Sequence, residues 1–261
     1  KLQELLEEAA QNNPEILAAN SEREAAQHRV SPAGALDDPM LEAGVVNVPL
    51  ASQTFRREDM TMKMLGLSQR FPYPGKRGLR QDVAAKDAEF VAHAYQETAN
   101  RVARDVKAAY FGLALVVEST RLVEESRRVV EQFLRISESR YAVGQATQAD
   151  VLNAQTQLTR MQDELIRLAS ERRAIEAELV RNLGRESDVG LPAPAALRLP
   201  ATVLQYESLR ETALKERPQL LGLQSLIDRS GKALDLAHRD YYPDVDVRLS
   251  YGQRGDMLDG I

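Results

Sequence analysis

The 261-residue sequence contains no cysteine and no tryptophan, and aromatic residues make up only 5% of it. Without cysteine, a disulfide framework, thiolate zinc sites, iron–sulfur clusters and a cysteine nucleophile are all excluded. No run of about 18 apolar residues occurs, which excludes a transmembrane helix. The net charge of −5 argues against nucleic acid as a partner, because phosphate binding needs a basic surface. The scarcity of aromatic residues favours long helix-on-helix seams, which are built from Leu, Val and Ala.

The sequence also lacks a recognisable catalytic or cofactor site. Its three histidines are far apart, with no second histidine at metal-ligand spacing. Pro74–Gly78 lacks the first glycine and the Ser or Thr of a phosphate-binding loop. A cationic collar at a strand-to-helix junction explains this stretch better. We therefore expect a protein that is not an enzyme and binds no cofactor.

Three methionines occupy alternate positions of a strand-like run, so Met60, Met62 and Met64 share one face. Thioethers bind soft metals such as Cu(I), which makes these side chains candidate metal ligands. Apolar filling of a half-buried strand explains the same pattern more simply, and the pattern alone favours that interpretation.

Hydrophobic periodicity and the placement of proline and glycine divide the chain into five segments. We predict N-terminal helices over 1–39, with Pro14 starting the second of them; a β-hairpin over 40–73, with strands at 41–48 and 60–70; a long helical hairpin over 74–184, with its tip at 142–150; a linker over 185–202; and helices followed by a strand at 244–251 within 203–261.

The long helical hairpin rests on two runs of apolar residues at alternating spacings of three and four. No proline occurs from Lys76 to Val143, and a second heptad run follows Gly144. Thr147 is a plausible N-cap, with Asp150 in the capping-box position. The predicted fold is mainly α: a long antiparallel coiled-coil hairpin with short β-hairpin segments.

The chain also contains an internal repeat at an offset of 204 residues. Eight residues recur without a gap: Leu5, Glu7, Ala9, Pro14, Leu17, Ser21, Ala33 and Pro39 match Leu209, Glu211, Ala213, Pro218, Leu221, Ser225, Ala237 and Pro243. A period this long is not a solenoid unit but a duplicated half. With this repeat, the chain ends inside the second copy. Because the sequence also begins without methionine, we expect a fragment.

Two stretches resemble a known family. Arg140–Gln155 is similar to the helix–turn–helix tip of TolC-type outer-membrane efflux proteins, with Asp150 six positions after Gly144 as in the family pattern. Gln69–Arg77 resembles the strand-to-helix junction of the heavy-metal branch, the relatives of the Czc and Cus outer-membrane components. The resemblance covers nearly the whole chain, about the first three fifths of a usual member.

The resemblance implies a TolC-like α/β barrel protomer, incomplete in this chain. It would form a homotrimer in the outer membrane and periplasm of a Gram-negative bacterium, in contact with outer-membrane lipid. The trimer would be a passive conduit for heavy-metal or drug export, linked by a periplasmic adaptor (membrane fusion) protein to an inner-membrane pump such as an RND transporter. Carried onto this sequence, the adaptor-docking residues are Gly144, Thr147, Asp150 and Val151, and Asp150 is also a gating contact.

Two alternative functions remain open from the residues alone. One is a soluble coiled-coil interaction module, against which the strand-like segments argue. The other is a periplasmic metal-binding protein that uses the methionine strand.

Overall fold

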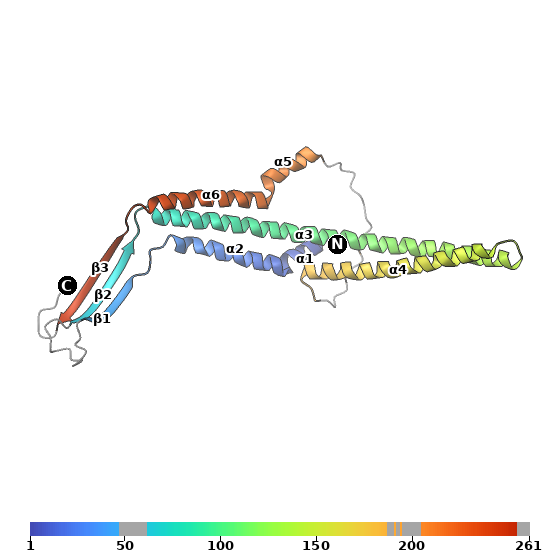
Figure 1. Cartoon of the computed structure of the whole chain (residues 1–261), viewed down its shortest axis with the longest axis horizontal. Coiled ribbons are helices and arrows are strands. Elements are labelled where there is room, and N and C mark those ends of the chain that lie inside the picture. The colour runs from blue at the N-terminus through green and yellow to red at the C-terminus, as the bar shows by residue number, and fades with distance from the viewer. Residues whose placement is uncertain (47–61, 187–190, 192–193, 195–204, 255–261) are drawn as a thin grey trace. The chain divides into compact units, whose positions relative to one another are not determined.

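The structure, a computed structural model, describes residues 1–46, 62–186, 191, 194 and 205–254. In these ranges six helices and three strands follow one another (Figure 1). They are α1 (Leu2–Asn12), α2 (Pro14–Ala33), β1 (Met40–Val46), β2 (Met62–Phe71), α3 (Lys76–Ala142), α4 (Gln148–Leu183), α5 (Tyr206–Glu216), α6 (Pro218–Arg239) and β3 (Val245–Arg254). Met60 and most of the predicted linker lie outside the described residues.

Contacts divide the chain into two units, each assembled from segments that are far apart in sequence. The first contains Lys1–Ser21 and Ala94–Arg217, and the second contains Glu22–His93 and Pro218–Ile261. The predicted segments were consecutive stretches of chain. The difference arises because α2 and α3 each contribute residues to both units.

A break at Asn13 separates α1 from α2, as the Asn-Pro step predicts. The backbone of Asn13 is extended, with φ −67° and ψ 123°. Its side-chain Oδ1 accepts hydrogen bonds from the backbone N–H groups of Glu15 (2.9 Å) and Ile16 (3.2 Å). These bonds satisfy donors at the start of α2, where Pro14 has no N–H to satisfy.

The same break recurs in the second copy of the repeat. Arg217 is extended, with φ −68° and ψ 116°, and Pro218 begins α6. The N–H of Arg217 donates to Ala213 O over 3.1 Å, and the N–H of Asn13 donates to Ala9 O over 3.0 Å. Both preceding helices, α5 and α1, have 11 residues. The break and the length of the preceding helix are therefore alike in the two copies of the predicted repeat.

The first unit is held by the predicted α3–α4 seam and by the helices that cover its end. Nine buried residues form one cluster: Leu5, Ala9, Ile16, Val102, Val106, Ala109, Leu113, Leu179 and Leu183. The α3 members have the predicted heptad spacing, and no aromatic residue belongs to the buried set. Because only α1, α2, α3 and α4 contribute, the core lies at the end of the hairpin away from the tip.

Gly184 ends α4 in a place where only glycine fits. Its φ is +68°, in the left-handed region, and a Cβ atom there would lie 2.4 Å from the carbonyl oxygen of Asn12. Next to this approach, Asn13 Nδ2 donates to the carbonyl oxygen of Asn182 over 2.8 Å. The end of α4 thus packs against the α1–α2 break, backbone against backbone.

The second unit contains a three-stranded antiparallel sheet in the order β1-β2-β3 (Figure 1). Met40 pairs with Ser68 and Val46 with Met62, which confirms the predicted hairpin between β1 and β2. β3 extends to Arg254, three residues beyond the predicted end, because it pairs with β2 along its whole length.

Helix α6 packs against α3 in the second unit. A Cβ atom on Gly222 would lie 3.3 Å from the ring of Phe90, so the two helices approach closely there. Two ion pairs also join the helices, Arg229 to Asp87 (3.1 Å) and Lys232 to Asp82 (3.3 Å).

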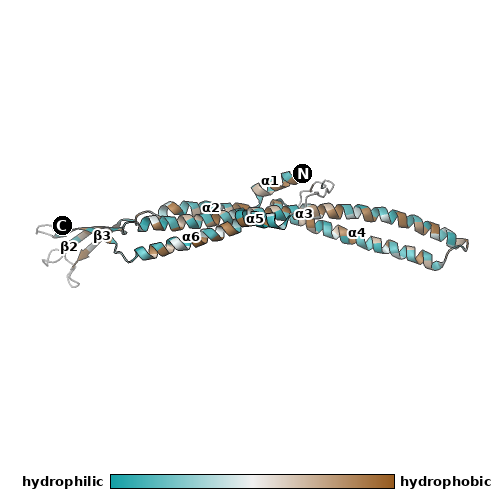
Figure 2. Cartoon of the chain, turned by 90° about the horizontal axis from the view of Figure 1, so that it is seen from above, coloured by the Kyte–Doolittle hydropathy of each residue, from teal (hydrophilic) through white to brown (hydrophobic). Residues whose placement is uncertain are grey.

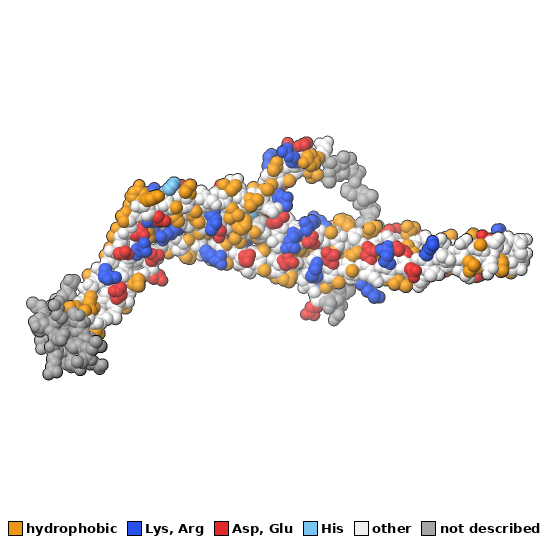
Figure 3. Space-filling view, viewed as in Figure 1, with side chains coloured by type: hydrophobic (Ala, Val, Ile, Leu, Met, Phe, Trp, Pro, Cys, Tyr) orange, Lys and Arg blue, Asp and Glu red, His pale blue; other side chains and the backbone are white. Residues whose placement is uncertain are grey.

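Some charges on the hairpin are paired within one helix. Arg121 bonds to Glu118 and Glu125 on α3. Arg167 bonds in the same arrangement to Glu164 and Glu171 on α4. Figure 3 shows positive and negative side chains interspersed along the helices on the visible face, with no large area of one sign.

Polar and apolar residues are mixed along the helices (Figure 2). Among the helices of the described ranges, none is both long enough and apolar enough to cross a bilayer.

We predict that Gly184→Ala lowers the stability of the first unit by at least about 2 kcal/mol, because a Cβ atom requires both a strained φ and a displaced backbone. The measurement is urea unfolding followed by circular dichroism. The matched control is Gly231→Ala, whose Cβ meets nothing within 4 Å. It should stabilise α6 by about 0.5–1 kcal/mol through helix propensity. Equal midpoints for Gly184→Ala and the parent would contradict the packing.

Candidate functional site

The hairpin tip begins with a glycine turn at the end of α3. Gly144 has φ +69°. The N–H of Gly144 donates to Tyr141 O (3.0 Å), and the N–H of Gln145 donates to Arg140 O (2.8 Å). These two bonds form a Schellman motif, which satisfies the last carbonyl groups of the helix.

The tip then closes with a capping box at the start of α4. The Thr147 N–H and hydroxyl donate to Asp150 Oδ2 over 2.9 and 2.7 Å, and the Asp150 N–H donates to Thr147 Oγ1 over 3.3 Å. The Thr147 hydroxyl and then its N–H lower the pKa of the Asp150 carboxyl. The predicted cap is confirmed, and it keeps Asp150 ionised.

The four predicted docking residues therefore lie on one short turn. Gly144, Thr147 and Asp150 are exposed, and Val151 is half-buried at the first turn of α4. The adaptor-docking role of these residues and the gating role of Asp150 stay predictions.

A second apolar stripe runs along α3, separate from the buried seam. Its members are exposed and follow spacings of 4, 7, 7, 4 and 3: Phe111, Leu115, Leu122, Val129, Phe133 and Ile136. On α4 the exposed large apolar residues are only Leu152 and Ile166. We call this set the α3 outer stripe. One heptad accounts for the buried seam of α3, and this second stripe was not predicted, although its spacing is visible in the sequence.

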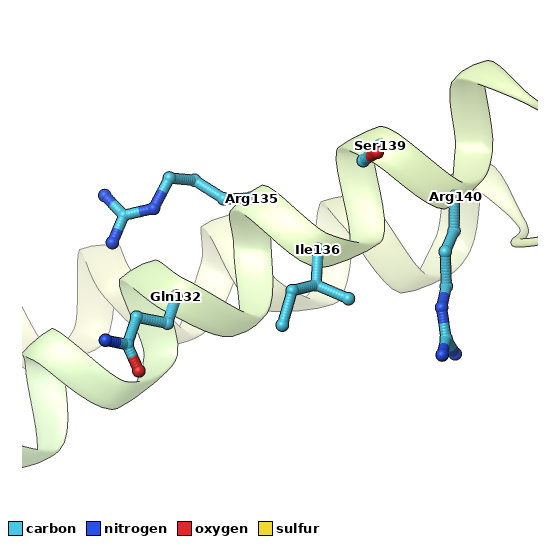
Figure 4. A pocket seen from close by; sticks show the side chains of 5 residues that line it. All are labelled: Gln132, Arg135, Ile136, Ser139 and Arg140. Atoms are coloured by element: carbon cyan, nitrogen blue, oxygen red, sulfur yellow. The ribbon is translucent and has the colours of Figure 1, made fainter.

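A shallow hollow of about 620 Å³ lies at the tip end of the α3 outer stripe. Gln132, Ile136 and Arg140 project from the same side of the helix (Figure 4). Arg135 and Ser139 complete its lining. Every lining residue comes from α3, so the hollow is an open surface rather than an enclosed pocket.

A second polar cluster lies where the sheet meets the helices of the second unit. Lys76 is nearly fully buried, with 4% of its surface exposed. It donates to Asp244 Oδ1 (2.8 Å) and to the carbonyl oxygen of Tyr242 (2.8 Å). Asp244 also accepts from the Tyr73 N–H (3.0 Å) and from Arg70 (2.9 Å). We call these residues the junction cluster.

The junction cluster ties the β2–α3 connection to the α6–β3 connection. Lys76 first, and then the Tyr73 N–H, hold the pKa of the Asp244 carboxyl far below its usual range. The Tyr73 and Tyr242 rings stack with centroids 4.7 Å apart. The cationic collar expected at Pro74–Gly78 is therefore wrong for Lys76, whose charge is buried and neutralised by carboxylates. Sequence could not reveal this, since Asp244 is 168 residues away.

The sheet has two chemically different faces. On one, cross-strand rows of apolar residues are exposed, for example Leu41, Leu67 and Leu249. We call this the apolar face. The other, the polar face, carries the row of Glu42, Gly66 and Ser250. Met62 and Met64, two of the predicted candidate ligands, lie on the polar face.

Within the part of the chain that the structure describes, no group of three or more His, Asp or Glu side chains is arranged to hold a metal ion. The described residues thus present an exposed tip turn, an apolar helix stripe and a two-faced sheet as candidate functional features.

Comparison with known protein families gives a match that covers the helical hairpin. The family model described as "Outer membrane efflux protein" matches residues 5–185, which contain all of α3, the tip and α4. No curated protein sequence matches the chain.

Solved channel structures share the fold. VceC from Vibrio cholerae is 19% identical, with a TM-score of 0.76 over 96% of this chain and 62% of its own. CusC is 15% identical, with a TM-score of 0.77 over 98% of this chain and 60% of its own. The open state of MtrE from Neisseria gonorrhoeae is 17% identical, with a TM-score of 0.75 over 98% of this chain and 59% of its own. The chain thus spans about three fifths of these channels and has the fold of an incomplete TolC-like protomer.

We predict that Lys76→Met opens the junction cluster, because Asp244 then loses its buried partner. Hydrogen exchange at the Tyr73 amide, which donates to Asp244, should accelerate at least tenfold. The matched control is Lys86→Met, on the same helix, which removes a partly exposed lysine paired with Glu89. The same acceleration in both variants would contradict a specific role for Lys76.

Proposed function

Since the chain belongs to the outer membrane efflux protein family, we propose that it is part of a channel-tunnel subunit that serves as a passive export conduit. Membership places the protein in the outer membrane and periplasm of a Gram-negative bacterium. The observation that carries the proposal is the family match over residues 5–185, which includes the complete α3–α4 hairpin. Transport through such a conduit depends on geometry and electrostatics, and no chemical step is needed.

The two-faced sheet supports the membrane end of this proposal. A strand of a membrane barrel alternates between a lipid-facing apolar side chain and a water-facing polar one. β2 shows this alternation, with Leu65 and Leu67 on the apolar face and Gly66 and Ser68 on the polar face. A sheet of three strands is too small to enclose a channel, so we propose that several chains combine their strands.

The α3 outer stripe supports the proposed homotrimer. In a helical tunnel each hairpin needs one apolar seam within itself and another toward its neighbour. α3 has both, the buried seam and the outer stripe. An exposed apolar surface of this length marks an interaction site rather than a solvent-facing wall.

We further propose that the tip docks a periplasmic adaptor (membrane fusion) protein, which links the conduit to an inner-membrane pump such as an RND transporter. The Schellman turn and the capping box fix the shape of the tip without help from other elements. Gly144, Thr147 and Asp150 present their exposed surfaces to a partner, with Val151 at the edge.

The gating proposal concerns Asp150. Both hydrogen bonds from Thr147 end on Asp150 Oδ2. A carboxylate has acceptor capacity on each oxygen, so Oδ1 can bind a donor from a neighbouring tip while the cap persists. Opening would then break an inter-tip bond without unwinding α4.

The conduit is tested by reconstituting the full-length protein in planar bilayers. We expect trimers that conduct. Phe133→Glu places a charge in the α3 outer stripe and should reduce trimer yield at least tenfold. Ile166→Glu is the control, because Ile166 is equally exposed but lies on α4, off the stripe. Conduction by monomers, or no conduction from the parent trimer, would refute the proposal.

Adaptor docking is tested with a photocrosslinking side chain in the full-length protein in cells. At Val143, which is exposed at the tip turn, we expect a crosslink to the adaptor. At Ile166, a similarly exposed aliphatic position farther along α4, we expect at most a tenth of that yield. Equal yields at both positions would show that the tip is not the docking point.

A further inference from the structure

All three methionines of the described strands lie on the polar face of the sheet, and none lies on the apolar face. Met40 pairs with Ser68, and Met62 and Met64 alternate with Lys63 and Leu65. The apolar face is built from other apolar residues: Leu41, Ala43, Val45, Leu65, Leu67, Phe71, Val245, Val247, Leu249 and Tyr251. Hydrophobic burial alone does not explain this separation, because Leu and Met have similar apolar character.

Packing does not explain the position of Met64 either. Its cross-strand neighbours are Gly44 on one side and Gly252 on the other. A Cβ atom added to Gly44 would meet nothing within 4 Å. A side chain that fills a core has neighbours in contact, whereas the flanking positions of Met64 carry no side chains and leave room above the sheet.

Met62 and Met64 are close enough to bind one ion together. Positions i and i+2 on one face of a strand are about 6.8 Å apart. Each methionine has three rotatable bonds beyond its Cβ and a polarizable sulfur, so the two thioethers can converge from adjacent positions. Uncharged sulfur ligands select soft cations such as Cu(I) over hard ones such as Mg²⁺.

The surroundings of Met64 strengthen this selectivity. A hollow of about 380 Å³ on the sheet is lined by Met64, Gly44, Glu42 and Arg248 among others. The Glu42 carboxylate pairs with Arg248 over 3.3 Å, reaching across the central strand where Gly66 has no side chain. The carboxylate that lines the hollow is therefore already engaged by a cation, which leaves the neutral Ser250 hydroxyl and the Met64 thioether as its other side-chain ligands.

We propose that Met62 and Met64 form a transit site for a soft monovalent cation, Cu(I) or Ag(I), on the water-facing side of the conduit. The inference rests on the proposed conduit function and names a substrate class for it. Two neutral thioethers bind weakly, which suits transport, because a permeating ion must leave as well as enter. Binding involves no change in oxidation state.

The test uses Ag(I), which is stable in air, with the full-length trimer in detergent and a nitrate buffer. Isothermal titration should show Ag(I) binding, and X-ray absorption should show Ag–S contacts. Met62→Leu/Met64→Leu conserves volume and should weaken binding at least tenfold. Met40→Leu, on the same face, is the matched control and should bind like the parent. Zn(II) should bind neither protein measurably.

Unchanged Ag(I) affinity in Met62→Leu/Met64→Leu would overturn the proposal, as would equal losses in Met40→Leu. Planar-bilayer conductance separates this result from the conduit function. A parent trimer that binds Ag(I) without conducting would refute the conduit and leave the metal site standing. A conducting parent without Ag(I) binding would refute only the site.

Discussion

The hydrogen bond from Asn13 to the carbonyl oxygen of Asn182 connects the α1–α2 break to the last turn of α4. The packing of the first unit depends on this connection. The same side chain caps α2 through Oδ1 and holds the last turn of α4 through Nδ2. An amide can do both because it carries an acceptor and donors on one planar group. With the break held in this way, α1 lies against α4, and Leu5 and Ala9 join the core. The long seam between α3 and α4 then has a closed end. Its buried cluster is aliphatic, with Tyr95 and Tyr110 packed against it as partly buried residues.

The second copy of the repeat shows which part of this arrangement is local and which is not. The backbone at Arg217 repeats that at Asn13, with the same extended conformation and the same hydrogen bond to the fourth preceding residue. Arginine, however, has no acceptor to cap α6. Leu209, the counterpart of buried Leu5, is 48% exposed. Proline and helix periodicity therefore suffice to reproduce the elements, whereas burial requires a matching surface for the helix to pack against.

Local sequence signals predicted most of the helices and strands but few of the polar contacts between distant segments. Pro14, Gly144 and Thr147 set the helix ends, since each acts through its own backbone or its nearest neighbours. Where the described residues include a predicted strand end, the strand was located to within three residues. The largest difference is at the end of β3, because pairing with β2, rather than local pattern, decides where β3 ends. The burial of Lys76 could not be predicted, since its partners come from a distant segment. The break at Gly144 and the cap at Thr147 located the tip, and the family resemblance supplied its expected role. The α3 outer stripe was missed because one heptad had already accounted for the helix.

The Glu–Arg–Glu groups on α3 and α4 have a consequence for how hairpins recognise one another. Arg121 and Arg167 each bind a carboxylate three residues before and another four residues after, within one helix. Each guanidinium thus uses three of its five N–H donors, and its charge is balanced by carboxylates, within its own helix. If hairpins pair as proposed, these two arginines add little charge information to the contact, and the fit of apolar side chains along the α3 outer stripe decides it. A contact of that kind would tolerate exchange of surface charges during evolution, but it would have little means of telling one hairpin from another by charge.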